Sequence, residues 1–319
     1  MNEGVVRPHS ARFYTLRRIA LITGAISALL SAYLMWSVYH PFGKTGVNEV
    51  KSMVIAAGPY RSNLLFKVTS ATTTPILVTI DGKPRSVLDM VILKDGSVLY
   101  SVFDTFTPLT SNVYKMGKDG VLTPLTNSSG FKDNFSVDPS ETHLVYEETK
   151  SNKREDIGNG ASPTIVQLSL NNGTVQEITT GTNPHFLQSG AIVVAQKEGT
   201  FVYPPSVGSK GNLILPSNTY SLYAVREDGS QVASYNYKTK SIDLFKVTAT
   251  GTLSYDYSTK VENQPMNLIY SEGSPVATEV SESPKGTVYI LTSYGRTIST
   301  TRFISTPAPM LERLIYVTK

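Results

Sequence analysis

The sequence contains no cysteine and only one tryptophan among 319 residues. The lack of cysteine excludes disulfides, thiolate metal sites and a cysteine nucleophile, and it fits an exported domain that avoids oxidative mispairing. The single tryptophan, Trp36, lies in an apolar run near the N-terminus. The rest of the chain therefore cannot contain repeats whose motif requires tryptophan.

Charged residues are also few, at 17% of the chain, while 40% of the residues are hydrophobic. Such a chain buries one large core or two modest ones and is not disordered. The first forty residues carry four arginines against Glu3, which leaves 25 of the 29 basic and 24 of the 25 acidic residues in the remainder. A main domain so close to neutral has no electrostatic footprint for nucleic acid.

The longest apolar run covers residues 19–38, IALITGAISALLSAYLMWSV, and contains no charge. At about 1.5 Å per residue, a helix of this length spans the roughly 30 Å of a bilayer core. Arg17 and Arg18 precede it, so the positive-inside rule predicts a cytoplasmic tail at 1–18, a linker at 39–49 and a periplasmic or extracellular domain at 50–319. A cleaved signal peptide is the alternative, although its apolar region is usually shorter.

Small residues recur at every fourth position of this predicted transmembrane helix, at Ala20, Gly24, Ala28 and Ala32. They form one stripe along the helix, and such a stripe allows two helix backbones to approach closely. The pattern predicts a surface through which two copies of the chain could pair.

Short strands with intervening turns return along the main domain. Similar strands, each preceded by a strand and a turn, begin at Ser97 (SVLYSV), Thr142 (THLVYE), Ala191 (AIVVAQ), Gln231 (QVASYN) and Thr287 (TVYILT). Two further strands follow within most units. Four short strands repeated every 40–50 residues or so are typical of a β-propeller, in which no blade buries its faces alone.

The expected fold is therefore all-β, a six-bladed β-propeller after one N-terminal transmembrane helix. Five or seven blades are the alternatives, and β-sandwiches in series would not need the same strand order each time. Residues 50–82 supply strands of the first blade, and the chain ends on a strand, LERLIYVTK, where the ring is expected to close. Whether the first blade borrows a strand to close the ring is open at this point.

The turns of these units resemble those of TolB-like propellers, in which an aromatic residue or serine precedes Pro-Asp-Gly and an apolar strand. The matching segments are Ser283–Gly286, Phe135–Pro139, Lys94–Gly96 and Glu227–Gly229. The resemblance covers residues 50–319 and implies a non-catalytic, extracytoplasmic platform for protein partners. Propellers of the WD-repeat, sialidase and quinoprotein kinds are disfavoured because their motifs require tryptophan.

Catalytic motifs are scarce in residues 50–319. His143 and His185 are the only histidines there, and no Gly-x-Ser-x-Gly elbow is present, so neither a histidine-rich metal site nor a serine hydrolase is predicted. Carboxylates from different blades can act together in a propeller channel. Asp89, Asp133 and Glu279, in or beside predicted innermost strands, are the candidates for that alternative, and no cofactor or metal is predicted.

Two features are candidates for partner binding. The polar loop at residues 149–162 contains Lys153, Arg154, Glu155 and Asp156. Long insertions between compact strands often carry recognition. Tyr235 with Tyr237, and Tyr255 with Tyr257, alternate along two strands of one blade; they could form an exposed aromatic strip or pack between blades.

The function predicted from these observations is a membrane-anchored propeller that binds an envelope or surface protein. The alternative is a propeller that binds or cleaves a glycan through its channel acids. A sensor is a third hypothesis, which would need a separate cytoplasmic partner because the predicted tail is too short for a signalling domain.

Overall fold

The computed structural model of the protein describes residues 52–57, 64–69, 73–106, 109–150, 162–205, 208–248, 251–271, 273–283, 286–294, 298–305 and 311–318. All of them belong to one compact unit, Glu49–Lys319. Within these ranges, no helix is long and apolar enough to cross a membrane. The predicted tail, transmembrane helix and linker, with the Ala20, Gly24, Ala28 and Ala32 stripe, lie outside the described residues, as do Lys153, Arg154, Glu155 and Asp156.

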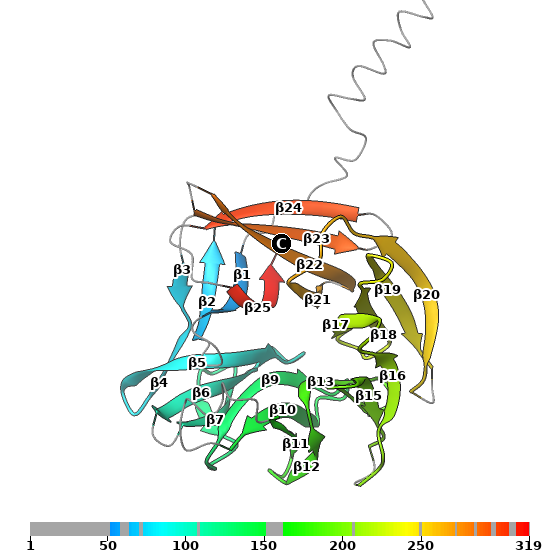
Figure 1. Cartoon of the computed structure of the whole chain (residues 1–319). Helices are drawn as coiled ribbons and strands as arrows, with labels where there is room; N and C mark the ends of the chain where they lie inside the picture. Colours follow the sequence, from blue (N-terminus) through cyan, green and yellow to red (C-terminus); the bar gives the residue numbers. More distant parts are fainter. Residues whose placement is uncertain are drawn as a thin grey trace, which may run out of the picture. The chain divides into compact units, whose positions relative to one another are not determined.

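The described strands form six antiparallel sheets, which we call blades 1 to 6, arranged around a common centre (Figure 1). Blade 1 consists of β25 (Leu311–Thr318), β1 (Ser52–Ala57), β2 (Leu64–Thr69) and β3 (Thr73–Pro75). Blade 2 consists of β4 (Leu77–Ile80), β5 (Lys83–Ile92), β6 (Val98–Phe106), β7 (Leu109–Met116) and β8 (Leu122–Pro124). Blade 3 consists of β9 (Phe131–Val137), β10 (His143–Thr149), β11 (Thr164–Ser169) and β12 (Val175–Thr180).

The remaining blades repeat the four-strand order of blade 3. Blade 4 consists of β13 (Thr182–Phe186), β14 (Ile192–Gln196), β15 (Gly199–Tyr203) and β16 (Asn212–Pro216). Blade 5 consists of β17 (Tyr220–Val225), β18 (Gln231–Asn236), β19 (Ser241–Val247) and β20 (Leu253–Lys260). Blade 6 consists of β21 (Asn267–Ser271), β22 (Ser274–Ser283), β23 (Gly286–Tyr294) and β24 (Ile298–Ser305). The prediction of an all-β fold with six blades is confirmed.

Blade 1 is completed by the last strand of the chain. β25 pairs antiparallel with β1, from Ser52 opposite Thr318 to Ala57 opposite Leu311. The first blade therefore borrows its inner strand from the C-terminus, which answers the question that the sequence left open. Ring closure joins the two ends of the propeller by backbone hydrogen bonds.

Apolar side chains fill the spaces between neighbouring blades. In β10, Leu144 and Tyr146 join a cluster with residues of blade 2, while Val145 joins a cluster with residues of blade 4. Successive side chains of a strand point to opposite faces of its sheet. The nearly continuous apolar run of this strand is thus explained, because both faces of the blade are buried.

The predicted repeat is correct for four units and wrong for the last one. TVYILT, which begins at Thr287, belongs to β23, the third strand of blade 6, and the second strand is β22. Blade 6 turns tightly after its inner strand, where Ser271 pairs with Ser274. The Pro-Lys-Gly sequence before Thr287 resembles the inner turns of other blades, but it joins the second and third strands.

Candidate functional site

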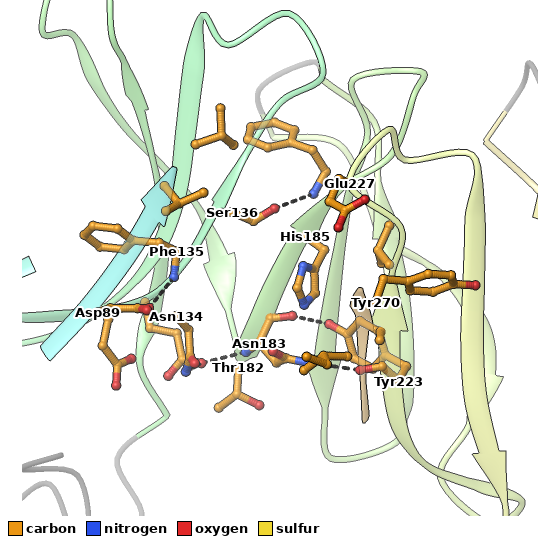
Figure 2. Close-up of a pocket in the computed structure, with 18 of the residues that line it drawn as sticks. Asp89, Asn134, Phe135, Ser136, Thr182, Asn183, His185, Tyr223, Glu227 and Tyr270 are labelled. Carbon is orange, nitrogen blue, oxygen red and sulfur yellow. Dashed lines mark hydrogen bonds between the residues drawn. The ribbon is translucent and has the colours of Figure 1, made fainter. Parts of the chain in front are cut away.

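A cavity of about 800 Å³ lies within the ring and is lined by residues of the inner strands β5, β9, β13, β17 and β21. We call its two ends the start end, where these strands begin, and the turn end, where they turn into the second strands. Figure 2 shows several of the lining residues, among them Asp89, Asn183, His185 and Tyr223. Residues of blades 2 to 6 thus line one cavity.

Four inner strands contain a β-bulge. β5, β9, β13 and β17 each have one more residue than the opposing part of the second strand. Asn134 and Asn183 lie in two of these bulges with φ values of 56° and 55°. Asparagine adopts this left-handed conformation more readily than most residues. A bulge also leaves backbone groups outside the ladder, so other partners are needed for them.

Asp89 supplies such a partner between blades 2 and 3. Its side chain is only 3% exposed. Its Oδ1 accepts a hydrogen bond from Met90 N at 2.8 Å, and its Oδ2 accepts one from Phe135 N at 2.7 Å (Figure 2). Hydrogen bonds to a charged acceptor are stronger than neutral ones. This carboxylate therefore links two blades through the bulge of β9.

Glu147 makes the corresponding link between blades 3 and 4. The side chain is buried, and its Oε1 accepts hydrogen bonds from the Asn134 amide and, at 2.6 Å, from Asn183 N. Neither Asn134 nor Asn183 has a ladder partner at its own position in the register. One carboxylate thus holds the bulges of two successive inner strands.

Tyr223 continues the chain of links from blade 4 to blade 5. Its hydroxyl donates to the carbonyl oxygen of Asn183, and its ring meets His185 edge to face at 5.8 Å. Burial raises the pKa of Tyr223 well above its ordinary value, and the charge of Glu147 acts in the same direction. The hydroxyl therefore stays protonated and acts as a donor over the physiological range.

The two ends of the cavity differ in charge and in exposed apolar residues. Lys94 and Arg226 lie at the turn end beside Glu141 and Glu227, and Lys94 N donates to Glu141 Oε1 at 2.6 Å. Ile92, 47% exposed, lines this end, whereas Met266, 51% exposed, lies at the start end. Each mouth thus offers one large apolar side chain that is about half exposed, and the turn end adds charged groups.

The predicted channel acids are only partly brought together. Asp89 and Asp133 line the cavity, and Asp133 lies opposite Glu147 in the register of β9 and β10. Glu279 was expected in or beside an innermost strand, and this placement is wrong. It lies in β22, the second strand, where its Oε2 accepts a hydrogen bond from Asn263 Nδ2 at 2.9 Å. The misplacement follows from the misassigned turn of blade 6.

The four predicted tyrosines do not form a continuous strip. Tyr235 is 3% exposed and packs in the cluster between blades 5 and 6, while Tyr237 begins the turn after β18 and is exposed. Tyr255 lies opposite Phe245 and Tyr257 lies opposite Leu244, with a bulge between them. Because successive residues point to opposite faces, the bulge places these two tyrosines on opposite faces of the sheet.

No sequence pattern predicted the roles of Glu147, Asn183 and Tyr223, or the buried ion pair between Lys132 and Glu148. Lys132 is 0% exposed, and its Nζ lies 3.4 Å from Glu148 Oε1. The Lys132 Nζ also donates to the carbonyl oxygens of Ser111, Ser128 and Gly130 at 2.8–3.2 Å. Burial lowers the pKa of Lys132, while Glu148 opposes that change. The sequence signal for a buried polar network was the presence of Glu147 and Glu148 in the otherwise apolar strand HLVYEET.

In the described part of the chain, no group of three or more histidine, aspartate or glutamate side chains could hold a metal ion. The carboxylates of Asp89 and Glu147 instead accept hydrogen bonds from backbone amides of the next blade. Chemically, the cavity provides a concave surface with charged groups beside Ile92 at the turn end and the half-exposed Met266 at the start end.

No protein-family model matches the chain, and no curated protein matches it by sequence. Solved structures do match. The TolB protein of Acinetobacter baumannii superposes with a TM-score of 0.53 at 13% identity, over 83% of this chain and 66% of the TolB chain. The fold is a TolB-like β-propeller. A chain of a nidogen/laminin complex superposes on this TolB-like propeller with a TM-score of 0.52 at 7% identity, over 83% and 97% of the two chains.

Proposed function

We propose that this protein is a membrane-anchored, extracytoplasmic propeller that binds another protein of the envelope or cell surface at a mouth of its cavity. The observation that carries the proposal is the set of links by which Asp89, Glu147 and Tyr223 hold neighbouring blades together. They fix the shape of the concave surface before any partner arrives. A surface ordered in advance loses less conformational entropy on binding.

The mouths have the composition of a recognition surface. Ile92 and Met266 are large apolar side chains left about half exposed, and charged groups line the same mouth as Ile92. Protein interfaces combine an apolar centre with a polar rim. The similar fold in a nidogen/laminin complex supports protein binding as a use for this architecture.

The binding experiment places a photo-crosslinking amino acid at one position at a time in the full-length protein in its native membrane. Ile92 and Met266 report on the two mouths, and Val121 and Val175, which are 58% and 53% exposed on outer strands or turns, are matched controls. One recurrent protein adduct from a mouth position, and not from the controls, is expected. Identical neighbours at all four positions, or no protein adduct at the mouths, would refute binding at the cavity.

The anchoring part of the proposal rests on the uncharged apolar run at residues 19–38 and the arginines before it. Alkaline carbonate extraction of membranes tests it with the full chain and with a chain that lacks residues 1–38. The full chain is expected to stay in the membrane pellet and the shortened chain to be released. Release of both chains from the membrane would contradict the proposed anchor.

A second candidate function, glycan binding or cleavage, is favoured by Asp133 and Glu147, which are register partners that both line the cavity. Glycosidases use paired carboxylates. Under this hypothesis, Asp133→Asn abolishes polysaccharide turnover in a protein that remains folded. Glu147 is a poor test residue because its substitution also breaks a link between blades. Absence of turnover by the natural protein would end this hypothesis.

A further inference from the structure

Three lysines gather at one turn of blade 5, at the start end of the ring. The turn joins β18 to β19 and carries Lys238 and Lys240, and Lys260 ends the adjacent strand β20. Ser241 pairs with Lys260, and Lys260 Nζ donates to Thr239 O at 2.6 Å. All three lysines are exposed. Together with Tyr237 they are called the blade 5 basic patch.

The ammonium groups of this patch have no acidic partner within the described part of the chain. No carboxylate oxygen of the described residues lies within 4.0 Å of Lys238, Lys240 or Lys260. Lys132, Lys150 and Lys246, in contrast, each form an ion pair. Two acids are near in the chain. The charge of Glu262 acts on Tyr294 of blade 6, and Asp243 is buried, where it accepts hydrogen bonds from Ser241 and Asn236 and leaves the exposed lysines as the only charges at the surface of this turn. The patch is therefore a local excess of positive charge on a nearly neutral domain.

The backbone of the turn is held in place by its neighbours. Asn236 Oδ1 accepts hydrogen bonds from Lys238 N at 3.1 Å and Thr239 N at 3.3 Å. Lys240 has a φ of 51°, and its carbonyl oxygen accepts from Val261 N at 3.0 Å. The positions from which the three lysine side chains start are thus fixed, and only the side chains need to be ordered by a ligand.

Tyr237 adds a planar surface beside these cations. Its hydroxyl donates to Ser217 O at 3.2 Å and its backbone N donates to Thr219 O at 3.1 Å, yet 40% of the residue stays exposed. A ring held in this way offers contact area at little entropic cost. A flexible polymer chain can lie against it while its charges meet the lysines.

We propose that the blade 5 basic patch binds an anionic polymer that carries repeated phosphate groups. Lysine is a common phosphate ligand, acting as a point charge, and several lysines around one turn suit a chain with several charges. A lipid headgroup shares this chemistry. The polymer is favoured because one polymer chain can present several phosphate groups to three lysines around a single turn, whereas each lipid headgroup presents one.

The test uses the full-length protein in neutral detergent and fluorescent inorganic polyphosphate as the probe. Binding is expected at about 0.05 M salt and should weaken strongly at about 0.5 M, because salt screens exposed charges. The triple variant Lys238→Gln, Lys240→Gln, Lys260→Gln should lose affinity at least about tenfold. The matched control replaces Lys67, Lys83 and Lys118, three other exposed lysines, with glutamine and should change affinity less than about twofold.

Three results in this arm would overturn the proposal: no polyphosphate binding by the natural protein at low salt, an equal loss of affinity in the control variant, or an unchanged affinity in the variant of Lys238, Lys240 and Lys260. A second arm uses vesicles with about 30 mol % phosphatidylglycerol. Binding to vesicles through the same lysines, with polyphosphate bound more weakly, would assign the patch to the membrane instead. Neither experiment depends on a protein partner, so a negative result in either one leaves the proposed protein-binding function untouched.

Discussion

The centre and the outer rim of this propeller use polar residues in opposite ways. Around the cavity, Asp89 and Glu147 are buried and accept hydrogen bonds from the next blade. On the rim, Lys238, Lys240 and Tyr255 are exposed, and the two lysines form no ion pair with described residues. The contrast teaches that polar residues near the centre stabilise the ring, so candidates for recognition are better sought at the mouths and on the rim.

The largest expected effect comes from removing the strand that closes the ring. A chain that ends at residue 305 lacks β25 and leaves the edge of β1 unpaired. An open edge and an uncovered inner face should prevent a cooperative fold or cause aggregation. Thermal unfolding followed by circular dichroism checks this. A shortened chain that melts as cooperatively as the full one would show that closure by β25 is dispensable.

Next in size is the loss of the buried cation. Lys132→Ala leaves Glu148 buried without its closest partner, and about 3–5 kcal/mol of the free energy of unfolding should be lost. Lys150 also approaches Glu148, at 3.7 Å, but its side chain is 58% exposed, so Lys150→Ala should cost less than about 1 kcal/mol. Denaturant unfolding measures both. Equal losses of unfolding free energy in the two variants would contradict the distinction between the buried Lys132 and the exposed Lys150.

Two tyrosines of blade 5 sharpen the comparison between the centre and the rim. Tyr235→Ala should lower the free energy of unfolding by about 3–4 kcal/mol because it opens a cavity between blades 5 and 6. Tyr255→Ala removes mainly an edge contact with Phe245, at 6.1 Å, and should cost about 1 kcal/mol. Denaturant midpoints of the two variants give the comparison. A larger loss for Tyr255 would place the structural core at the rim.

A smaller effect than the losses expected for Lys132→Ala and Tyr235→Ala is a pH dependence at the turn after β9. Burial raises the pKa of Asp138, but hydrogen bonds from Ser140, Thr142 and His143 outweigh this, so the pKa lies below its ordinary value. The stabilisation is therefore present above about pH 3.9 and is lost as the pH falls through the lower folded value. Asp138→Asn should cost about 1–2 kcal/mol at pH 7, with a smaller difference near pH 2–3. A constant difference between these pH values would argue against a charged acceptor.

The strand pattern allowed much of the fold to be predicted, because each blade repeats an apolar strand, a turn and a second apolar strand. Blade 6 was misassigned because the turn before Thr287 has the composition of an inner turn, which moved Glu279 to the wrong strand. The bulge at Asp256 could not be read either, since one extra residue changes the face of Tyr257 without changing the alternation in the sequence.

The candidate site was less predictable than the fold for a physical reason. Asp89 was recognised as a residue of the channel, but its partner, Phe135 N, lies 46 positions later in the chain. A carboxylate that binds a backbone amide and one that awaits a substrate look the same in a sequence. Only the register of the neighbouring blade separates a link between strands from a catalytic candidate.

Hydrogen exchange of the Phe135 and Asn183 amides tests the central claim, that the cavity carboxylates hold the blades together. Both amides lie in bulges, and their acceptors are Asp89 and Glu147. The account predicts slow exchange at both amides. It also predicts a local increase of at least about tenfold at Phe135 in Asp89→Ala and at Asn183 in Glu147→Ala, with Tyr255→Ala as a control that affects neither. Rapid exchange of both amides in the natural protein, as fast as in exposed turns, would contradict it.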